Sequence, residues 1–158
     1  MHEVKLTQGQ VALVDDCDKA LVDGYKWCAA WNYNTRSFYA IAHTYRDGKR
    51  TTVSMHRIIL GLSRGTQGDH RNHDTMDNRR DNLRPATASQ NAMNRRRRSD
   101  NTSGMRGVRQ YAQTGKWVAR IGIGGKLKHL GYFLTPEDAY AAYGRAAAEH
   151  HGEFMRAH

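Results

Sequence analysis

The sequence predicts an α+β protein with a strand-rich N-terminal region and, near the C-terminus, a three-stranded antiparallel sheet packed on one helix. Two segments rich in aromatic and β-branched residues flank Asp47-Gly48, a dipeptide typical of tight hairpin turns. Three further strand-like segments follow residue 104, punctuated by glycines, and an alanine-rich segment comes after them. Strands grouped in this way and followed by a helix are typical of α+β folds.

The first region, residues 1–61, contains most of the predicted strands. Residues 11–14 form a short apolar run, and residues 38–46 and 49–55 are the two arms of the predicted hairpin. Ser54 is placed to cap a short helix over residues 55–60, which would end at Gly61.

The second region, residues 62–94, is mostly loop up to residue 82. Residues 82–87 predict a short strand, and Pro85 favours an edge position for it. Thr87 is a candidate cap for a helix over residues 88–94. Loop, strand and helix in this order fit a β-hairpin followed by a helix if another short strand ends near His70.

The third region begins after a basic linker, residues 95–104, which opens with four consecutive arginines. Strands are predicted over residues 105–111, 116–123 and 126–134. Thr135 and Pro136 then provide a cap and a first turn for a helix that includes residues 139–148. The predicted domains are therefore residues 1–94, with a core motif in 62–94, and residues 105–158.

The charge balance predicts a polyanionic partner. The 158 residues carry a formal net charge of +10, which favours nucleic acid first and an anionic membrane surface second. The absence of a long apolar run argues against the membrane. The two cysteines, Cys17 and Cys28, form no C-x-x-C pair and suit a reducing cytoplasm, and the first residues lack the apolar core of a signal peptide. We expect a cytoplasmic protein.

Four polar residues have a spacing that suits metal-assisted hydrolysis. Asp69 and His70 are adjacent, Asn82 follows His70 by 12 residues, and Asn91 follows Asn82 by 9. A carboxylate and an amide oxygen suit a hard cation, and a neutral imidazole can accept a proton near pH 7. Taken singly, each residue also has a structural interpretation: a turn aspartate, a surface histidine, a strand-start asparagine and a helix-surface asparagine.

The segment GDHRNHDTMDNRRDNLRPATASQN, residues 68–91, closely resembles the HNH (ββα-metal) nucleases, in particular the HNH homing endonucleases of phages. The resemblance implies that His70 is the general base and that Asp69 and Asn91 hold one divalent metal, magnesium or alternatively manganese. It also implies that Asn82 fixes the strand that carries His70. Many HNH enzymes have histidine at the position of Asn91, and asparagine makes the site harder and less suited to zinc.

Residues 103–154 resemble the Apetala-two (ethylene-response-factor) DNA-binding fold through the pattern RGVR, GKWVARI, LGYF, TPEDAYAAY and HG. The resemblance implies that the sheet contacts double-stranded DNA through Arg106, Arg109, Trp117 and Arg120; Trp117 has core packing as its alternative. Tyr111 and Arg120 depart from the plant pattern, so the plant target sequence does not transfer. Basic residues elsewhere suit the DNA backbone: Arg79, Arg80, Arg84, Arg95, Arg96, Arg97, Arg98, Lys126 and Lys128.

Together these patterns predict a site-specific, metal-dependent DNA endonuclease of the phage homing or nicking type, acting in a bacterial host cell as a monomer or homodimer. A restriction or packaging nuclease would use the same chemistry. The non-enzymatic alternative is a sequence-specific DNA-binding regulator with a relict nuclease motif.

Overall fold

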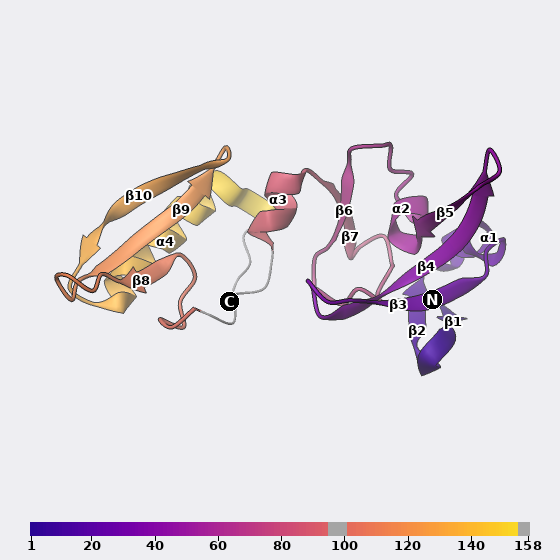
Figure 1. Ribbon diagram of the computed structural model, residues 1–158, viewed down its shortest axis with the longest axis horizontal. Helices are drawn as coiled ribbons and strands as arrows, with labels where there is room; N and C mark the ends of the chain where they lie inside the picture. The colour runs from indigo at the N-terminus through magenta and orange to yellow at the C-terminus, as the bar shows by residue number, and fades with distance from the viewer. Residues whose placement is uncertain (95–100, 155–158) are drawn as a thin grey trace. The chain divides into compact units, whose positions relative to one another are not determined.

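The computed structural model describes residues 1–94 and 101–154, and its fold is α+β, as predicted (Figure 1). The chain divides into two compact units, Met1–Asn91 and Ala92–His158. No helix in the described residues is long and apolar enough to cross a bilayer.

The N-terminal unit is built from small antiparallel sheets: β1 pairs with β2, β3 with β4 and β4 with β5, and β6 with β7. Its elements in chain order are β1 (His2–Lys5), η1 (Thr7–Gly9), β2 (Val11–Val14), η2 (Asp16–Asp18), α1 (Lys19–Asp23), β3 (Trp27–Asn32), β4 (Ser37–Arg46), β5 (Lys49–Ser54), α2 (Met55–Ile59), β6 (Gln67–His70) and β7 (Leu83–Ala86). Helix α3 (Ala88–Met93) contains the boundary between the units.

The predicted hairpin at Asp47-Gly48 is confirmed as the turn between β4 and β5. Asp47 and Gly48 have φ angles of 51° and 71°, the left-handed pair that a two-residue hairpin turn requires. The predicted cap at Ser54 is wrong in detail, because this residue occupies the N-cap position of α2 but its side chain makes no capping hydrogen bond. Thr87 does cap α3, since its hydroxyl accepts from the backbone N–H of Gln90 at 3.2 Å.

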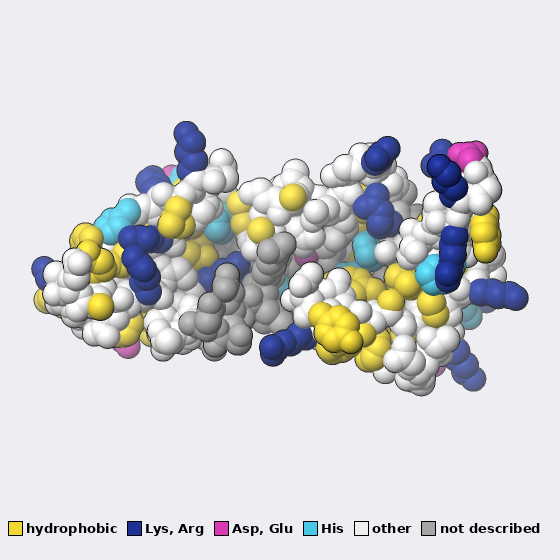
Figure 2. Space-filling view, viewed as in Figure 1, with side chains coloured by type: hydrophobic (Ala, Val, Ile, Leu, Met, Phe, Trp, Pro, Cys, Tyr) yellow, Lys and Arg dark blue, Asp and Glu magenta, His cyan; other side chains and the backbone are white. Residues whose placement is uncertain are grey.

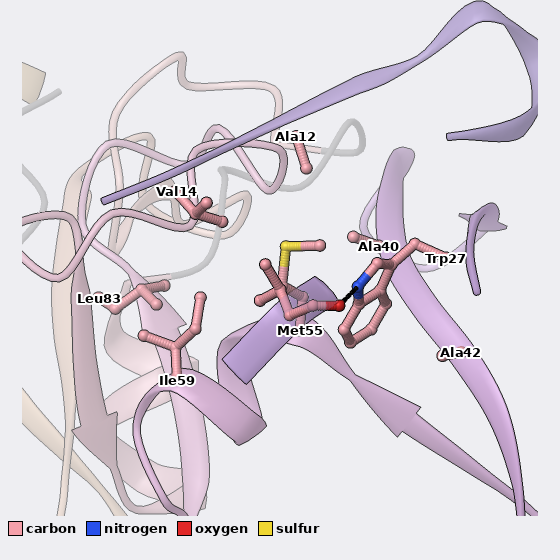
Figure 3. Packing of buried hydrophobic residues seen from close by; sticks show 9 residues of the cluster. Ala12, Val14, Trp27, Ala40, Ala42, Met55, Ile59 and Leu83 are labelled. Carbon is pink, nitrogen blue, oxygen red and sulfur yellow. Dashed lines mark hydrogen bonds between the residues drawn. The ribbon is translucent and has the colours of Figure 1, made fainter. Parts of the chain in front are cut away.

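One apolar cluster joins the N-terminal strands to the β6–β7 hairpin (Figure 3). Met55 is fully buried in it, and Trp27 donates its indole N–H to the carbonyl of Val22 at 2.8 Å. Leu83, the first residue of β7, packs in the same cluster as Val14 of β2. Burial of these side chains therefore fixes the hairpin to the rest of the unit.

The loop between β6 and β7 is anchored by backbone pairing with β2. Leu13 donates its backbone N–H to Met76 at 2.8 Å and accepts from that of Asn78 at 2.8 Å, and it forms a parallel bridge with Asp77. The hydroxyl of Thr75 also donates to the carbonyl of Phe38 in β4. Strands β2 and β4 of the N-terminal region thus support this loop.

The C-terminal unit is a three-stranded antiparallel sheet in the order β10–β9–β8 with α4 packed on one face (Figure 1). The elements are β8 (Val108–Gln110), β9 (Trp117–Ile123), β10 (Lys126–Phe133), α4 (Pro136–His151) and η3 (Gly152–Phe154). Thr135 caps α4 as predicted, accepting from the N–H of Asp138 at 3.1 Å. Strand β8 is shorter than predicted, because residues 105–107 form a turn.

Gly107 is required by the packing between that turn and α4. It has a φ of 71°, and a Cβ atom at this position would lie 2.2 Å from the Tyr143 ring. A side chain here would therefore meet both a strained backbone and a direct clash.

Candidate functional site

Asp69 and His70 end strand β6 and lie opposite Arg84 and Leu83 of β7. Both side chains are buried, with 5% and 6% of their surfaces exposed. Successive residues of a strand point to opposite faces, so the carboxylate and the imidazole have different neighbours. The short strand near His70 on which the hairpin interpretation depended is present as β6, and it ends at His70.

The His70 ring is enclosed by polar and aromatic groups. Its Nε2 lies 3.4 Å from Oδ1 of Asn78, and its ring centroid lies 5.2 Å from that of His56 and 6.2 Å from that of Tyr39. Gly68 leaves room for His56, since a Cβ at Gly68 would lie 2.5 Å from Cδ2 of that ring. Burial lowers the pKa of His70 and so favours the neutral ring, while the hydrogen bond to Oδ1 of Asn78 and the nearby acidic groups oppose this shift.

His56 is held neutral more strongly than its neighbour. Burial, followed by the nearby His70 and Arg57, lowers the pKa of His56 to about 3. The ring of His56 lies against that of His70, so these two neutral imidazoles share one largely buried environment.

Acid should destabilise the fold through His56. The pKa is lower in the folded than in the unfolded chain, so the unfolded chain gains the proton first, and stability falls as the pH drops from about 6.5 towards 3. Between pH 7 and pH 4.5 we expect a loss of about 2–3 kcal/mol from this group. Urea unfolding of the wild type and of His56→Phe at both pH values measures this loss of unfolding free energy. The variant should lose less stability than the wild type between the two pH values. Equal losses would contradict the attribution of the acid sensitivity to His56.

The Asp69 carboxylate pairs with Arg84. Nε of Arg84 donates to Oδ2 of Asp69 at 2.8 Å, and Nη2 lies 2.7 Å from the same oxygen. Arg84 is itself only 5% exposed. We predicted Arg84 as a surface contact to the DNA backbone, and the structure corrects this, because the guanidinium is buried in an ion pair across the hairpin.

Asn82 holds the loop that follows His70. Its Nδ2 donates to the carbonyl of Asp77 at 2.7 Å, and its Oδ1 accepts from the backbone N–H of Asn72 at 2.9 Å. Its own carbonyl accepts from the N–H of Arg71, the residue after His70, at 2.8 Å. This geometry is compatible with the positioning role that the sequence predicts for Asn82.

Asn91 lies beside β6 but is not brought to the His70 face. Its Nδ2 donates to Oε1 of Gln67 at 2.8 Å. Gln67 and Asp69 are two residues apart on one strand and share a face of it. Asn91 is therefore on the side of the hairpin that carries the carboxylate.

The chemistry of Asp69 and Asn91 fits a hard divalent cation, because one offers a carboxylate and the other an amide oxygen on the same side of β6. In residues 1–94 and 101–154, no group of three or more His, Cys, Asp or Glu side chains is arranged to hold a metal ion. Asp69 and Asn91 are the residues that would hold one, and Asp69 would do so while paired with Arg84.

The arginines near the motif are engaged within the protein. Both Nε and Nη2 of Arg79 donate to the Asp77 carboxylate, each at 2.7 Å. Arg80 pairs in the same way with the buried Asp18, at 2.8 and 2.6 Å. These ion pairs attach the loop to itself and to η2, so the surface charge predicted at Arg79 and Arg80 is partly neutralised. The predicted contacts Arg95, Arg96, Arg97 and Arg98 lie outside the described residues.

Strand alternation divides the predicted DNA contacts of the C-terminal unit between two faces. Arg109 is paired with Val118 and Arg120 with His129, on the face of the sheet opposite α4. Lys126 and Lys128 are paired with Ile123 and Ile121, whose side chains pack towards the helix. Both lysines are exposed on the edge strand β10, but their register directs them away from the two arginines.

Two further predicted contacts have structural partners. Trp117 packs against the apolar core under α4, which favours its core-packing alternative. Arg106 hydrogen-bonds Tyr143 and donates to the carbonyl of Ala92 at 3.2 Å. Figure 2 shows basic side chains spread over both units on the visible face, with few acidic ones among them.

Part of the chain is similar to a plant transcription factor. Over 56 residues the chain is 45% identical to the ethylene-responsive transcription factor WRI1 of Arabidopsis thaliana. The match covers 34% of this chain and 13% of that protein. No protein-family model matches the chain, and no solved structure matches it significantly.

Proposed function

We propose that the protein binds double-stranded DNA through its C-terminal unit and hydrolyses a phosphodiester bond at the β6–β7 hairpin of its N-terminal unit, as a phage-type homing or nicking endonuclease. The observation that carries the proposal is a buried, neutral His70 next to Asp69, at the end of a strand whose following loop is held by Asn82. The net charge of +10 and the similarity to a transcription factor support the DNA partner.

In the proposed reaction His70 accepts a proton from water, and the water oxygen bonds to phosphorus as the P–O3′ bond breaks. Asn82 keeps His70 in place by fixing the loop. A divalent cation bound at Asp69 and Asn91 would neutralise charge on the phosphate and on the leaving oxygen. The resemblance to HNH nucleases implies products with 5′-phosphate and 3′-hydroxyl ends.

DNA affinity should depend steeply on salt, and the sheet face opposite α4 should dominate it. Arg109→Ala and Arg120→Ala should each reduce the slope of log affinity against log salt by about 1 if they contact phosphates, or relax sequence preference if they contact bases. Lys126→Ala and Lys128→Ala are matched controls on the other face, and we expect smaller effects. Gel-shift titrations of the full chain in EDTA at several salt concentrations measure the salt slope and the sequence preference of each variant. Equal effects at all four positions would contradict the assignment of the DNA contacts to the sheet face opposite α4.

The second candidate function is a DNA-binding regulator with a relict nuclease motif. Two observations favour it: the Asp69 carboxylate is already paired with Arg84, and the similar protein is a transcription factor. Nicking of supercoiled plasmid in magnesium separates the candidates, because a regulator would bind the plasmid and leave it intact.

A further inference from the structure

Three aromatic side chains gather at the turn end of the β3–β4 hairpin, and the proposed reaction uses none of them. This aromatic patch consists of Trp31, Tyr33 and Phe38. Tyr33 is 85% exposed and Trp31 44% exposed, while Phe38 is half-buried. Single exposed apolar residues are ordinary on a protein surface, but a contiguous group of rings indicates an interaction surface.

The rings of the aromatic patch are ordered by one another and by the turn. Trp31 is paired with Phe38 across the two strands, and their ring centroids lie 4.9 Å apart. The Tyr33 ring stands edge-on to that of Trp31, at 90° and 6.5 Å. Oδ1 of Asn32 accepts from the backbone N–H of Asn34 at 2.9 Å and so fixes the start of the turn. Rings held in this way lose little conformational freedom when a ligand binds.

The charges around the aromatic patch favour an anionic ligand. Residues 24–46, which include both strands and the turn, contain Lys26, Arg36 and Arg46 but no Asp or Glu. Arg36 is exposed in the turn itself. A nucleotide combines a planar base, which can stack on an aromatic ring, with a phosphate, which an arginine can bind.

A stable protein partner would need a larger surface. Such interfaces cover about 800 Å² of each partner, whereas a whole aromatic side chain buries about 150–250 Å². Trp31 and Phe38 are already partly covered, so the aromatic patch supplies less than a protein interface needs. A single nucleobase needs only the face of one exposed ring.

The aromatic patch lies close to the proposed cleavage site along the same hairpin. The loop that follows His70 donates a hydrogen bond to the carbonyl of Phe38. The next residue, Tyr39, has its ring 6.2 Å from that of His70. Tyr33 is three residues beyond Ala30, the partner of Tyr39, which is about 10 Å along the hairpin. A DNA strand that passes His70 could therefore reach the patch.

We infer that the aromatic patch binds an unpaired nucleobase of DNA, which stacks on the rings of Tyr33 and Trp31 while Arg36 contacts the adjacent phosphate. The binding is a property of the N-terminal unit and does not require cleavage. Only the placement of this base next to the cut phosphate rests on the proposed function.

Binding of the full chain to a short single-stranded oligothymidylate in EDTA tests the inference, because this strand has no base pairs and little stacking of its own. Tyr33→Ala should weaken the affinity by about 5-fold or more, as expected for the loss of one base–aromatic stack. Tyr33→Phe should bind like the wild type, because it retains the ring. Neither variant changes the charge, so the salt dependence should stay the same.

Tyr45→Ala is the matched control. Tyr45 is 77% exposed on the same strand but lies at its other end, paired with Arg50 of β5. Its replacement removes an equally accessible ring outside the aromatic patch, and we expect a change in affinity of less than about 2-fold.

Tryptophan fluorescence provides a second readout of the contact. Stacking of thymine on Trp31 should quench the emission of the wild type, and Trp31→Leu should abolish this quenching. The other two tryptophans are shielded from the oligonucleotide, since Trp27 is 8% exposed and Trp117 packs in the core under α4.

Equal effects of Tyr33→Ala and Tyr45→Ala, or unchanged quenching in Trp31→Leu, would overturn the inference. A wild-type dimer that Tyr33→Ala dissociates without loss of oligothymidylate affinity would assign the aromatic patch to a second copy of the chain, and would also overturn it. The expected losses in a protein that never nicks plasmid would refute the proposed endonuclease and leave the base-binding patch intact.

Discussion

Replacing His70 with alanine is expected to reduce DNA cleavage by about 10³-fold or more, since a positioned general base contributes about 10² to 10⁴ in rate. DNA affinity should remain, because the proposed DNA-binding sheet lies in the C-terminal unit. His70 lies next to Asp69 at the end of β6, and its Nε2 is 3.4 Å from Oδ1 of Asn78. Single-turnover cleavage and gel-shift titration of the same preparations measure the two quantities separately.

His73→Asn is the matched control for that experiment. His73 lies in the same loop and has a φ of 65°, a conformation that asparagine adopts readily. We expect this variant to cleave at close to the wild-type rate. Full cleavage by a folded His70→Ala protein would refute the assignment of the base.

Arg84→Leu is expected to destabilise the N-terminal unit by about 3–5 kcal/mol, because it would leave the Asp69 carboxylate buried without its partner. The double variant Asp69→Ala/Arg84→Leu should recover part of this loss, since neither charge then remains buried. Urea unfolding of the wild type, both single variants and the double variant measures the coupling between the two residues.

An exposed ion pair provides the comparison for Arg84. Lys19 pairs with Asp23 on the surface of α1, with 49% of each side chain exposed. Lys19→Met should cost less than about 1 kcal/mol. If Arg84→Leu cost no more than Lys19→Met, the Asp69–Arg84 pair would not be the structural element that its burial indicates.

Local signals were sufficient to predict several elements. The left-handed turn at Asp47-Gly48, the cap at Thr87 and the cap at Thr135 each depend on neighbouring residues, and all three are confirmed. The hairpin interpretation required a short strand ending near His70, and β6 meets this condition because it ends at His70. The pairing of β1 with β2 was missed, because a four-residue strand leaves little periodicity in the sequence.

The contacts that organise the candidate site could not be predicted locally. Asp15 accepts from the backbone N–H of Arg80, 65 residues away in sequence, and Leu13 pairs with the loop at Asp77. Such contacts depend on the tertiary fold. For the same reason the ion pair of Arg84 was missed, since composition alone indicates that an arginine is exposed.

The most direct test of the central claim is the conversion of supercoiled plasmid to open circles by the purified full chain, in magnesium and in EDTA. The proposal predicts nicks with 5′-phosphate and 3′-hydroxyl ends in magnesium only, and none with Asp69→Ala or His70→Ala. A wild-type protein that shifts the plasmid in gels but never nicks it in magnesium or manganese would contradict the claim, and would favour the DNA-binding regulator.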